Sequence, residues 1–346
     1  MQLMEWLKKN EKLVFWNRCR LHCNEPEFRK WVIDDYYDPD LVRINTYGDE
    51  YRGQMIYHIG EYACEVGFFS EVIFTLFRLF YADDRGMIPY VNWGKGHLYY
   101  EPDGIDGEKN VFLYYFEPAS QVKSIEHAAY VIHATYEHIH TVQDYFNTHG
   151  YDVTNLYMQT LTSMVKKYLK YNEKTENFLK QEYEALIGDK KALAVHFRGT
   201  DYRRQYNNHP VFVTIEQEIE EITRLIEKNN YEVIFLATDE QEAISIFRDK
   251  FGEMLKVYED TWRACEGDES VAYSHSDRKN HHYLLGLEVL RDQYTLTRCQ
   301  GIVCGVSNLT IMARVMRKAW YEPYENMVII DNGICANEKA FCDAKH

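Results

Sequence analysis

Residues 192–204 read ALAVHFRGTDYRR, an apolar run that ends in a cluster of charged side chains. The run 192–197 has the length and composition of a buried strand. In parallel α/β sheets, ligands bind beyond the carboxyl ends of the strands. The charged cluster that follows this strand is therefore a candidate ligand site.

Three residues of this stretch define the candidate site. Arg198 alternates with His196 along the emerging strand, and Gly199 lets the backbone turn close to whatever fills the crevice. The guanidinium of Arg198 can hold a diphosphate through two parallel hydrogen bonds. It can equally pair with Asp201 across a tight turn, and the sequence alone leaves both interpretations open.

The chain beyond residue 191 alternates between short strands and helices. Strands are predicted at 192–197, 232–237, 255–258, 301–306 and 327–331. Helices are predicted at 214–228, 240–251, 283–297 and 308–319. A capping box between Thr214 and Gln217 supports the start of the first helix. This alternation predicts a parallel, doubly wound sheet.

The first half of the chain is less regular, and we interpret it as a second α/β domain. Its predicted features are Gly67 ahead of an apolar helix at 68–82, a strand at 87–93, a polar loop at 94–107 and an apolar run at 111–116. The segment 156–187 is long, charged and helical in pattern, which makes it the natural hinge. We expect domains at 1–187 and 188–346.

The charge balance excludes a broad nucleic-acid-binding surface. The chain carries 39 Lys and Arg against 54 Asp and Glu, a formal charge of −15. A protein that binds nucleic acid mainly by neutralising phosphates needs the opposite balance. Any anionic ligand must therefore meet a local cluster of positive groups.

The sequence predicts a cytoplasmic protein. Its longest apolar stretch, 72–82, is broken by Arg78 and is shorter than the roughly 20 residues that cross a bilayer. The first residues are too charged for a secretory signal, and the eight cysteines include no CxxC pair. Cys19, His22 and Cys23 could form half a zinc site, but no partner pair follows, so incidental cysteines are the favoured interpretation.

Polar side chains also follow two other predicted strands. Asp239 comes after the second strand, where a capping box with Glu242 explains it and a ligand contact is compatible with that role. Ser307 and Asn308 open a helix after the fourth strand, and free N–H groups there suit a phosphate. A plain N-cap explains these two residues as well.

Two more residues are weaker candidates. Asp292 lies on the helix before the fourth strand, where by itself it is expected to be a solvated surface residue. Gly67 with Ser70 could open an acceptor site at the start of the first apolar helix. A tight turn explains Gly67 equally well.

Patterns for a metal or a phosphate loop are poor. The sequence has no GxGxxG, GxxxxGK[ST], HExxH or GxSxG motif. The pairs Asp38/Asp40 and Asp103/Asp106 could chelate a cation bound to a sugar nucleotide, although solvated loop carboxylates are the favoured interpretation. Three histidines without ligand-like companions are predicted to lie in a loop: His275, His281 and His282.

Three motifs follow one another over about residues 190–315. They are His196-Phe-Arg198-Gly-Thr-Asp201, then Phe-Leu-Ala-Thr-Asp239, then Asp292 leading to Val-Cys304-Gly-Val-Ser307-Asn308. Together they resemble, in order and approximate spacing, the GDP-fucose-dependent fucosyltransferases. That group includes the core α-1,6 enzymes, the nodulation-factor enzyme and the protein O-fucosyltransferases.

The resemblance implies a GT-B fold, in which two Rossmann-like α/β domains face a central cleft and the C-terminal one holds the sugar nucleotide. It implies that Arg198 binds the β-phosphate and helps GDP to leave, while His196 contacts the nucleotide. Asp239 and Asp292 would lie near the guanosine. Ser307 and Asn308 would lie at the diphosphate. The group inverts the anomeric centre without a metal, so no cofactor is expected besides the donor, GDP-fucose.

The chain departs from the core α-1,6 enzymes where a general base is expected. Those enzymes carry a glutamate about ten residues after the motif histidine, where this chain has Gln205 and Tyr206, and a lysine in place of Tyr202. Asp201 is then the nearest candidate base, or else it orients Arg198.

We therefore expect an inverting, metal-independent glycosyltransferase that moves fucose from GDP-fucose to a glycan or lipid-linked oligosaccharide. Its expected partners are these two substrates, with no nucleic acid and no transmembrane segment, and a transient contact with a membrane surface is compatible with this expectation. The alternatives are a transferase of the same fold with another nucleotide sugar and a non-catalytic protein that binds nucleotides or glycans.

Overall fold

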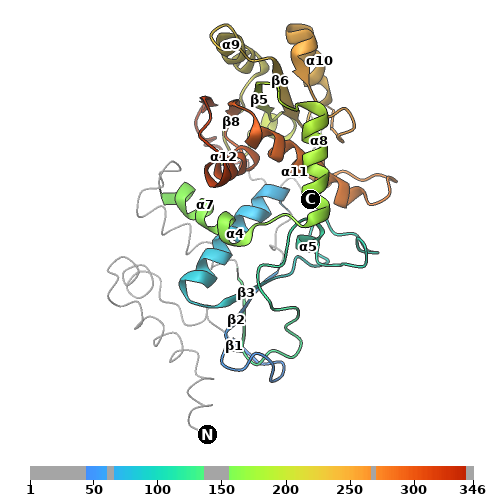
Figure 1. The fold of residues 1–346 in the computed structure, drawn as a ribbon, viewed down its shortest axis with the longest axis vertical. Coiled ribbons are helices and arrows are strands. Elements are labelled where there is room, and N and C mark those ends of the chain that lie inside the picture. The colour runs from blue at the N-terminus through green and yellow to red at the C-terminus, as the bar shows by residue number, and fades with distance from the viewer. Residues whose placement is uncertain (1–43, 61–65, 136–155, 266–269, 340–346) are drawn as a thin grey trace. The chain divides into compact units, whose positions relative to one another are not determined.

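The computed structural model describes residues 44–60, 66–135, 156–265 and 270–339 (Figure 1). Contacts divide the chain into two compact units. Unit 1 comprises residues 1–65, 71–97 and 108–170, and unit 2 comprises residues 66–70, 98–107 and 171–346. Units defined by contacts need not coincide with folding domains, so the domain bounds 1–187 and 188–346 stay a prediction.

Unit 2 is built on a five-stranded parallel sheet in the order β7-β6-β5-β8-β9. Its strands are β5 (Ala192–Phe197), β6 (Val233–Thr238), β7 (Leu255–Lys256), β8 (Gly301–Gly305) and β9 (Asn326–Ile330). The middle strand, β5, is buried along its whole length. The predicted parallel, doubly wound sheet is confirmed.

The strand order creates a switch point between β5 and β8. The chain leaves β5 toward β6 and β7, and then returns to β8 on the other side of β5. In open α/β sheets the ligand crevice lies outside the carboxyl ends of the strands at such a point. The register pairs His196 with Cys304, so the residues that follow β5 and β8 emerge side by side.

Helices cover both faces of this sheet. They are α8 (Glu173–Leu186), α9 (Ile215–Ile226), α10 (Gln241–Phe251), α11 (His281–Arg298) and α12 (Asn308–Trp320), with short 3-10 helices η3 (Asp201–Arg204), η4 (Gly252–Met254) and η5 (Val271–Tyr273). Figure 1 shows α9 and α10 on one side of the strands and α11 and α12 on the other. On the α9 and α10 side, Val195 and Phe197 belong to one apolar core with Ile222 and Phe247.

Unit 1 contains a four-stranded sheet in the order β1-β4-β2-β3, parallel except for β1. Its strands are β1 (Ile44–Asn45), β2 (Ile56–Ile59), β3 (Ile88–Val91) and β4 (Val131–His133). Among the described residues before 170, the helices are α4 (Phe68–Asp84), α5 (Val111–Tyr115) and α7 (Leu156–Tyr168). The expected second α/β arrangement is confirmed, and the apolar run 111–116 contains α5.

The segment 156–187 is helical, as its pattern indicates, and it contains two helices, because Asn172 caps a new one by accepting a hydrogen bond from the backbone N–H of Thr175. One local expectation is wrong. His281 and His282 are the first residues of α11 and do not lie in a loop. The turn before α11 is made by Asn280, whose φ of 56° lies in the left-handed region that asparagine tolerates.

In the ranges that the structure describes, no helix combines the length and the apolar character needed to cross a bilayer.

The buried stripe of α9 contains one carboxylate. Ile215, Ile222 and Leu225 face the core, and Glu218 lies in the same stripe with 1% of its surface exposed. Its Oε2 atom has no hydrogen-bond partner among the described residues, and burial raises its pKa well above the ordinary value. A carboxyl group of this kind lowers the stability of the fold as the pH rises above the pKa that the same group has in the unfolded chain.

Candidate functional site

The candidate site lies at the switch point between β5 and β8. Arg198 is the first residue after β5, and Asp201 begins the 3-10 helix η3. On the neighbouring strand, Ser307 and Asn308 follow the end of β8 and begin α12. The sequence motifs on these two strands are therefore brought together by the sheet.

Two carboxylates hold the guanidinium of Arg198. Its Nη2 atom lies 2.8 Å from Asp201 Oδ1, and its Nη1 atom lies 3.0 Å from Asp239 Oδ2. A third hydrogen bond, of 3.2 Å, runs from Nη2 to the hydroxyl oxygen of Ser270. The side chain of Arg198 still keeps 29% of its surface exposed. Of the two interpretations left open by the sequence, the pair with Asp201 is present, and the ligand contact stays a prediction.

The guanidinium of Arg198 stays protonated and positively charged. Burial lowers the pKa of this guanidinium, but the negative charges of Asp201 and Asp239 outweigh burial and raise the pKa above its ordinary value. Asp201 and Asp239 also offset the positive charge of Arg198. The guanidinium with its two acids therefore does not amount to the local cluster of positive groups that we expected for an anionic ligand. An anionic ligand would need further donors beside Arg198.

Asp239 shapes the turn after β5. Its Oδ1 atom accepts a 2.9 Å hydrogen bond from the backbone N–H of Gly199, and its Oδ2 atom accepts one of 2.6 Å from the hydroxyl of Thr200. The predicted capping box of Asp239 with Glu242 is wrong, because the residue at the N-cap of α10 is Glu240. The local sequence favoured a capping role for Asp239, but its side chain instead accepts hydrogen bonds from the turn after β5.

Gly199 is required by a close contact within the protein. A Cβ atom at this position would lie 1.9 Å from Glu240 Oε2. The side chain of Glu240 is held in place by two hydrogen bonds from Arg203, of 2.8 and 3.0 Å. The close approach that the sequence predicted here is made by Glu240.

His196 presents an open nitrogen beside Arg198. The residue is 5% exposed, and its Nδ1 atom has no hydrogen-bond partner among the described residues. Burial, with a smaller contribution from the positive charge of Arg198, lowers the pKa of His196 to about 3. The ring is therefore neutral at physiological pH and can exchange a hydrogen bond with a ligand.

The N-termini of α12 and α4 meet at this site within unit 2. Ser307 acts as a plain N-cap, with its hydroxyl oxygen accepting a 3.2 Å hydrogen bond from the N–H of Thr310. The side-chain amide of Asn308 donates a 2.7 Å hydrogen bond to the hydroxyl of Ser70, in the first turn of α4. Gly67 stands just ahead of that turn. Helix N-termini favour anions, although the N–H groups of Phe68, Ser70 and Thr310 already donate within the protein.

Asp292 is buried on α11, which corrects the expectation of a solvated residue. It is 7% exposed, and no described residue forms a hydrogen bond or an ion pair with its carboxylate. Burial raises its pKa to about 7, opposed by the charges of Arg263 and Arg291 and reinforced by those of Glu288 and Asp260. A buried carboxylate without a partner lowers the stability of the fold. Such groups are typical of ligand-binding and catalytic sites.

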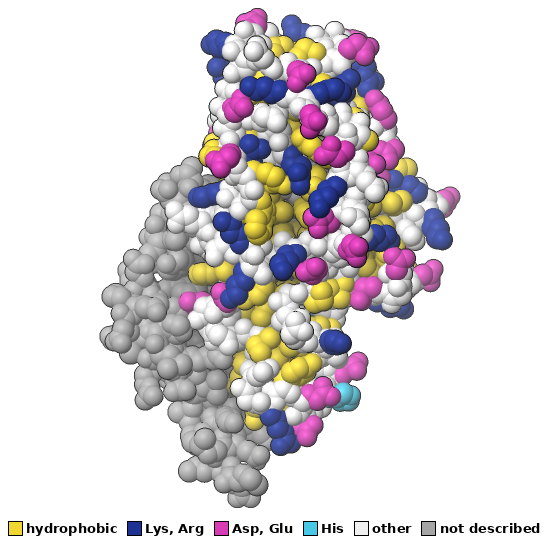
Figure 2. Space-filling view, viewed as in Figure 1, with side chains coloured by type: hydrophobic (Ala, Val, Ile, Leu, Met, Phe, Trp, Pro, Cys, Tyr) yellow, Lys and Arg dark blue, Asp and Glu magenta, His cyan; other side chains and the backbone are white. Residues whose placement is uncertain are grey.

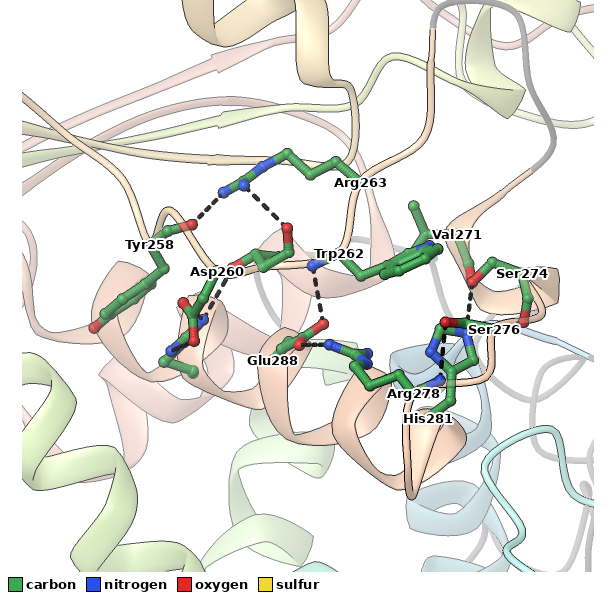
Figure 3. A network of polar contacts seen from close by, with 12 residues as sticks. Tyr258, Asp260, Trp262, Arg263, Val271, Ser274, Ser276, Arg278, His281 and Glu288 are labelled. Carbon is green, nitrogen blue, oxygen red and sulfur yellow. Dashed lines mark hydrogen bonds and ion pairs between the residues drawn. The ribbon is translucent and has the colours of Figure 1, made fainter.

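The loop 258–263, which follows β7, lies over α11, where Asp260 pairs with Arg291 (Figure 3). Glu288 connects the two, because it accepts a 3.2 Å hydrogen bond from the backbone N–H of Trp262 and pairs with Arg278 at 2.5 Å. The loop is thus braced from the helix below it. Figure 2 shows lysine, arginine and acidic side chains mixed over the visible face of the molecule.

The metal-site candidates gain no support. Asp106 forms an exposed ion pair of 2.6 Å with Lys174. Among the described residues, no three or more His, Cys, Asp or Glu side chains are grouped to hold a metal ion. The remaining candidates lie outside the described residues: Cys19, His22, Cys23, Asp38 and Asp40.

Sequence reasoning missed two residues of the site, Ser270 and Arg263. Both lie in the irregular segment between β7 and α11, where neither a period nor a capping motif marks a position. Ser270 contacts Arg198, and Arg263 binds backbone oxygens around the loop 258–263.

Replacing Gly199 by Ala should destabilise unit 2 by about 1–3 kcal/mol, because the added methyl group would displace Glu240 from Arg203. Thermal or urea unfolding measures the change. Gly67→Ala is the matched control, because nothing lies within 4 Å of a Cβ atom there. Equal stability of the two variants would show that Glu240 does not occupy this space.

No protein-family profile and no curated protein matches the chain. Among solved structures it is similar to NodZ α-1,6-fucosyltransferase soaked with GDP-fucose, with 15% identity, a TM-score of 0.48, and coverage of 76% of this chain and 92% of that chain. It is also similar to POFUT1 in complex with GDP-fucose, with 12% identity, a TM-score of 0.49, and coverage of 81% of this chain and 99% of that chain.

Proposed function

We propose that this protein is an inverting glycosyltransferase that takes fucose from GDP-fucose and transfers it to a glycan or a lipid-linked oligosaccharide. The observation that carries the proposal is the place of Arg198. A charged, partly exposed guanidinium stands at the carboxyl end of the central strand, at the switch point, with two carboxylates fixing its orientation.

The reaction needs positive groups at the leaving diphosphate. An acceptor hydroxyl attacks the anomeric carbon, the bond from that carbon to the phosphate oxygen breaks, and negative charge develops on GDP. Arg198 and the N-terminus of α12 are suited to receive this charge. One well-placed donor of this kind contributes about 2.7–4 kcal/mol to lowering the barrier. In this proposal these protein groups take the part that a metal ion plays in other transferases.

Asp201 has the role of orienting Arg198 in this proposal. Its Oδ1 atom is already engaged by Arg198 and by the hydroxyl of Thr200, at 2.8 and 3.1 Å. Because Oδ1 is engaged in this way, we assign Asp201 the orienting role and not the removal of the proton from the incoming hydroxyl. In this proposal the proton of the acceptor hydroxyl is taken by another group, which lies where the acceptor binds.

Asp292 and His196 suit the nucleoside. Guanine presents adjacent N1–H and N2–H donors, which one carboxylate can accept together, whereas the Watson–Crick edges of uracil and adenine lack that pair. Asp292 is buried, and its carboxylate forms no hydrogen bond with any residue that the structure describes, so it is suited to such donors. The open Nδ1 of His196 offers one further hydrogen bond.

Incubation with GDP-fucose tests the enzymatic part of the proposal. The wild type should slowly release GDP and fucose even without an acceptor, with EDTA present. Arg198→Ala should lower this rate by about 10²–10³-fold, because the developing charge loses its principal donor. Arg224→Ala, which removes an exposed arginine paired with Glu221 on α9, is the control and should keep the wild-type rate.

The outcomes separate the competing functions. Tight binding of GDP-fucose without turnover would favour a non-catalytic binding protein. Turnover of a different nucleotide sugar in preference to GDP-fucose would favour another transferase of the same fold.

Calorimetry with GDP, UDP, ADP and CMP tests the guanine part, and the wild type should bind GDP most tightly. Its affinity for GDP should be about tenfold lower at pH 6 than at pH 8, because the carboxyl group of Asp292 has a pKa of about 7 and accepts N–H donors only when ionised. Asp292→Asn should remove both the preference for GDP and this pH dependence.

Glu218→Gln is the matched control for Asp292→Asn. Both changes remove a buried carboxyl group whose pKa is raised by burial, so both should raise the melting temperature at neutral pH. Only Asp292→Asn should alter GDP binding. Retained preference for GDP in Asp292→Asn would contradict the assignment of the base.

A further inference from the structure

Among the described residues, the hydrogen-bond partners of the Arg263 guanidinium are all backbone oxygens. Its Nε donates to the carbonyl of Thr238 at 3.2 Å, Nη1 to that of Thr261 at 3.1 Å, and Nη2 to that of Tyr258 at 2.7 Å. Figure 3 shows the guanidinium above the loop 258–263, turned toward Tyr258. No described carboxylate forms an ion pair with this arginine. Its hydrogen bonds therefore join the loop to the carboxyl end of β6.

The backbone of the next residue, Ala264, also joins the loop to the end of β6. The N–H of Ala264 donates to the carbonyl of Asp239 at 2.9 Å, and the carbonyl of Ala264 accepts from the N–H of Gln241 at 3.0 Å. Arg263 and Ala264 thus fasten the four residues 238–241 to the loop after β7. Asp239, whose carboxylate holds Arg198 and the turn after β5, lies inside that fastened stretch.

The same arginine acts on Asp292. Four charged groups bear on the Asp292 carboxylate, and of these the charges of Arg263 and Arg291 favour its ionised form. The charges of Glu288 and Asp260 oppose ionisation. Arg291 is itself engaged with Asp260 at 2.7 Å, whereas Arg263 has only backbone carbonyls as partners.

We propose that Arg263 is a positioning residue for the nucleotide, which holds the loop 258–264 against the end of β6 so that Asp239 and Asp292 stay in place to meet a nucleoside diphosphate. The inference rests on the proposed function. A lysine cannot replace it, because one ammonium group cannot span three carbonyls in the way a planar guanidinium does.

Calorimetric titration of GDP with two variants separates the geometry from the charge of Arg263. Arg263→Lys keeps the charge and loses the three-way contact, so its GDP affinity should fall by about tenfold or more while the pH midpoint of binding stays near the wild-type value. Arg263→Gln loses both the charge and the three-way contact, so the pH midpoint of its GDP binding should also move to higher pH. Its affinity should partly recover between pH 7 and pH 9, which a merely collapsed loop would not allow.

Arg248→Lys is the matched control, because Arg248 is an exposed arginine that pairs with Glu259 beside the same loop. It should bind GDP as the wild type does. If the wild type fails to bind GDP, the proposed function fails. If the wild type binds GDP and Arg263→Lys binds it equally well, this inference alone is overturned.

Amide hydrogen exchange of the wild type covers the case in which neither variant folds. Addition of GDP should slow exchange at the amides of Ala264 and Gln241, since both donate within the junction that Arg263 closes. Unchanged exchange at these two amides, with GDP bound, would overturn the inference.

Discussion

The account depends on the ion pairs that hold Arg198 between Asp201 and Asp239. The central position of β5 places the guanidinium at the switch point, and the two carboxylates fix its direction before any ligand arrives. Preorganisation of this kind is useful because no energy is spent on turning the group during the reaction. The same carboxylates offset the charge, so the helix N-termini at Asn308 and Ser70 become part of the requirement for binding an anion.

The site keeps polar groups that the described protein does not satisfy. The open Nδ1 of His196 and the unpartnered carboxylate of Asp292 each lower stability, and both lie near the carboxyl ends of the sheet in unit 2. Glu218 shows that burial alone does not mark a site, because it carries a comparable penalty on a helix face within the core. What distinguishes the first two is their place beside Arg198 and beside the braced loop 258–263.

The strands and helices of unit 2 could be predicted because their signals are local: apolar runs, helical periodicity and caps such as Thr214 with Gln217. The place of Arg198 at the end of the central strand could be predicted since it follows such a run directly, and its role in the site stays a prediction. The burial of Asp292 could not, because it depends on the loop 258–263 packing over α11. The role of Asp239 was misjudged for a related reason, as its contact with Gly199 joins residues 40 positions apart. In unit 1, β2 and β4 are too short to leave a clear pattern.

A crystal structure of the complex with GDP would test the central claim most directly. The account predicts a β-phosphate oxygen within hydrogen-bond distance, about 2.7–3.2 Å, of a guanidinium nitrogen of Arg198. A bound GDP whose phosphate oxygens all lie beyond about 4 Å from that guanidinium would contradict it.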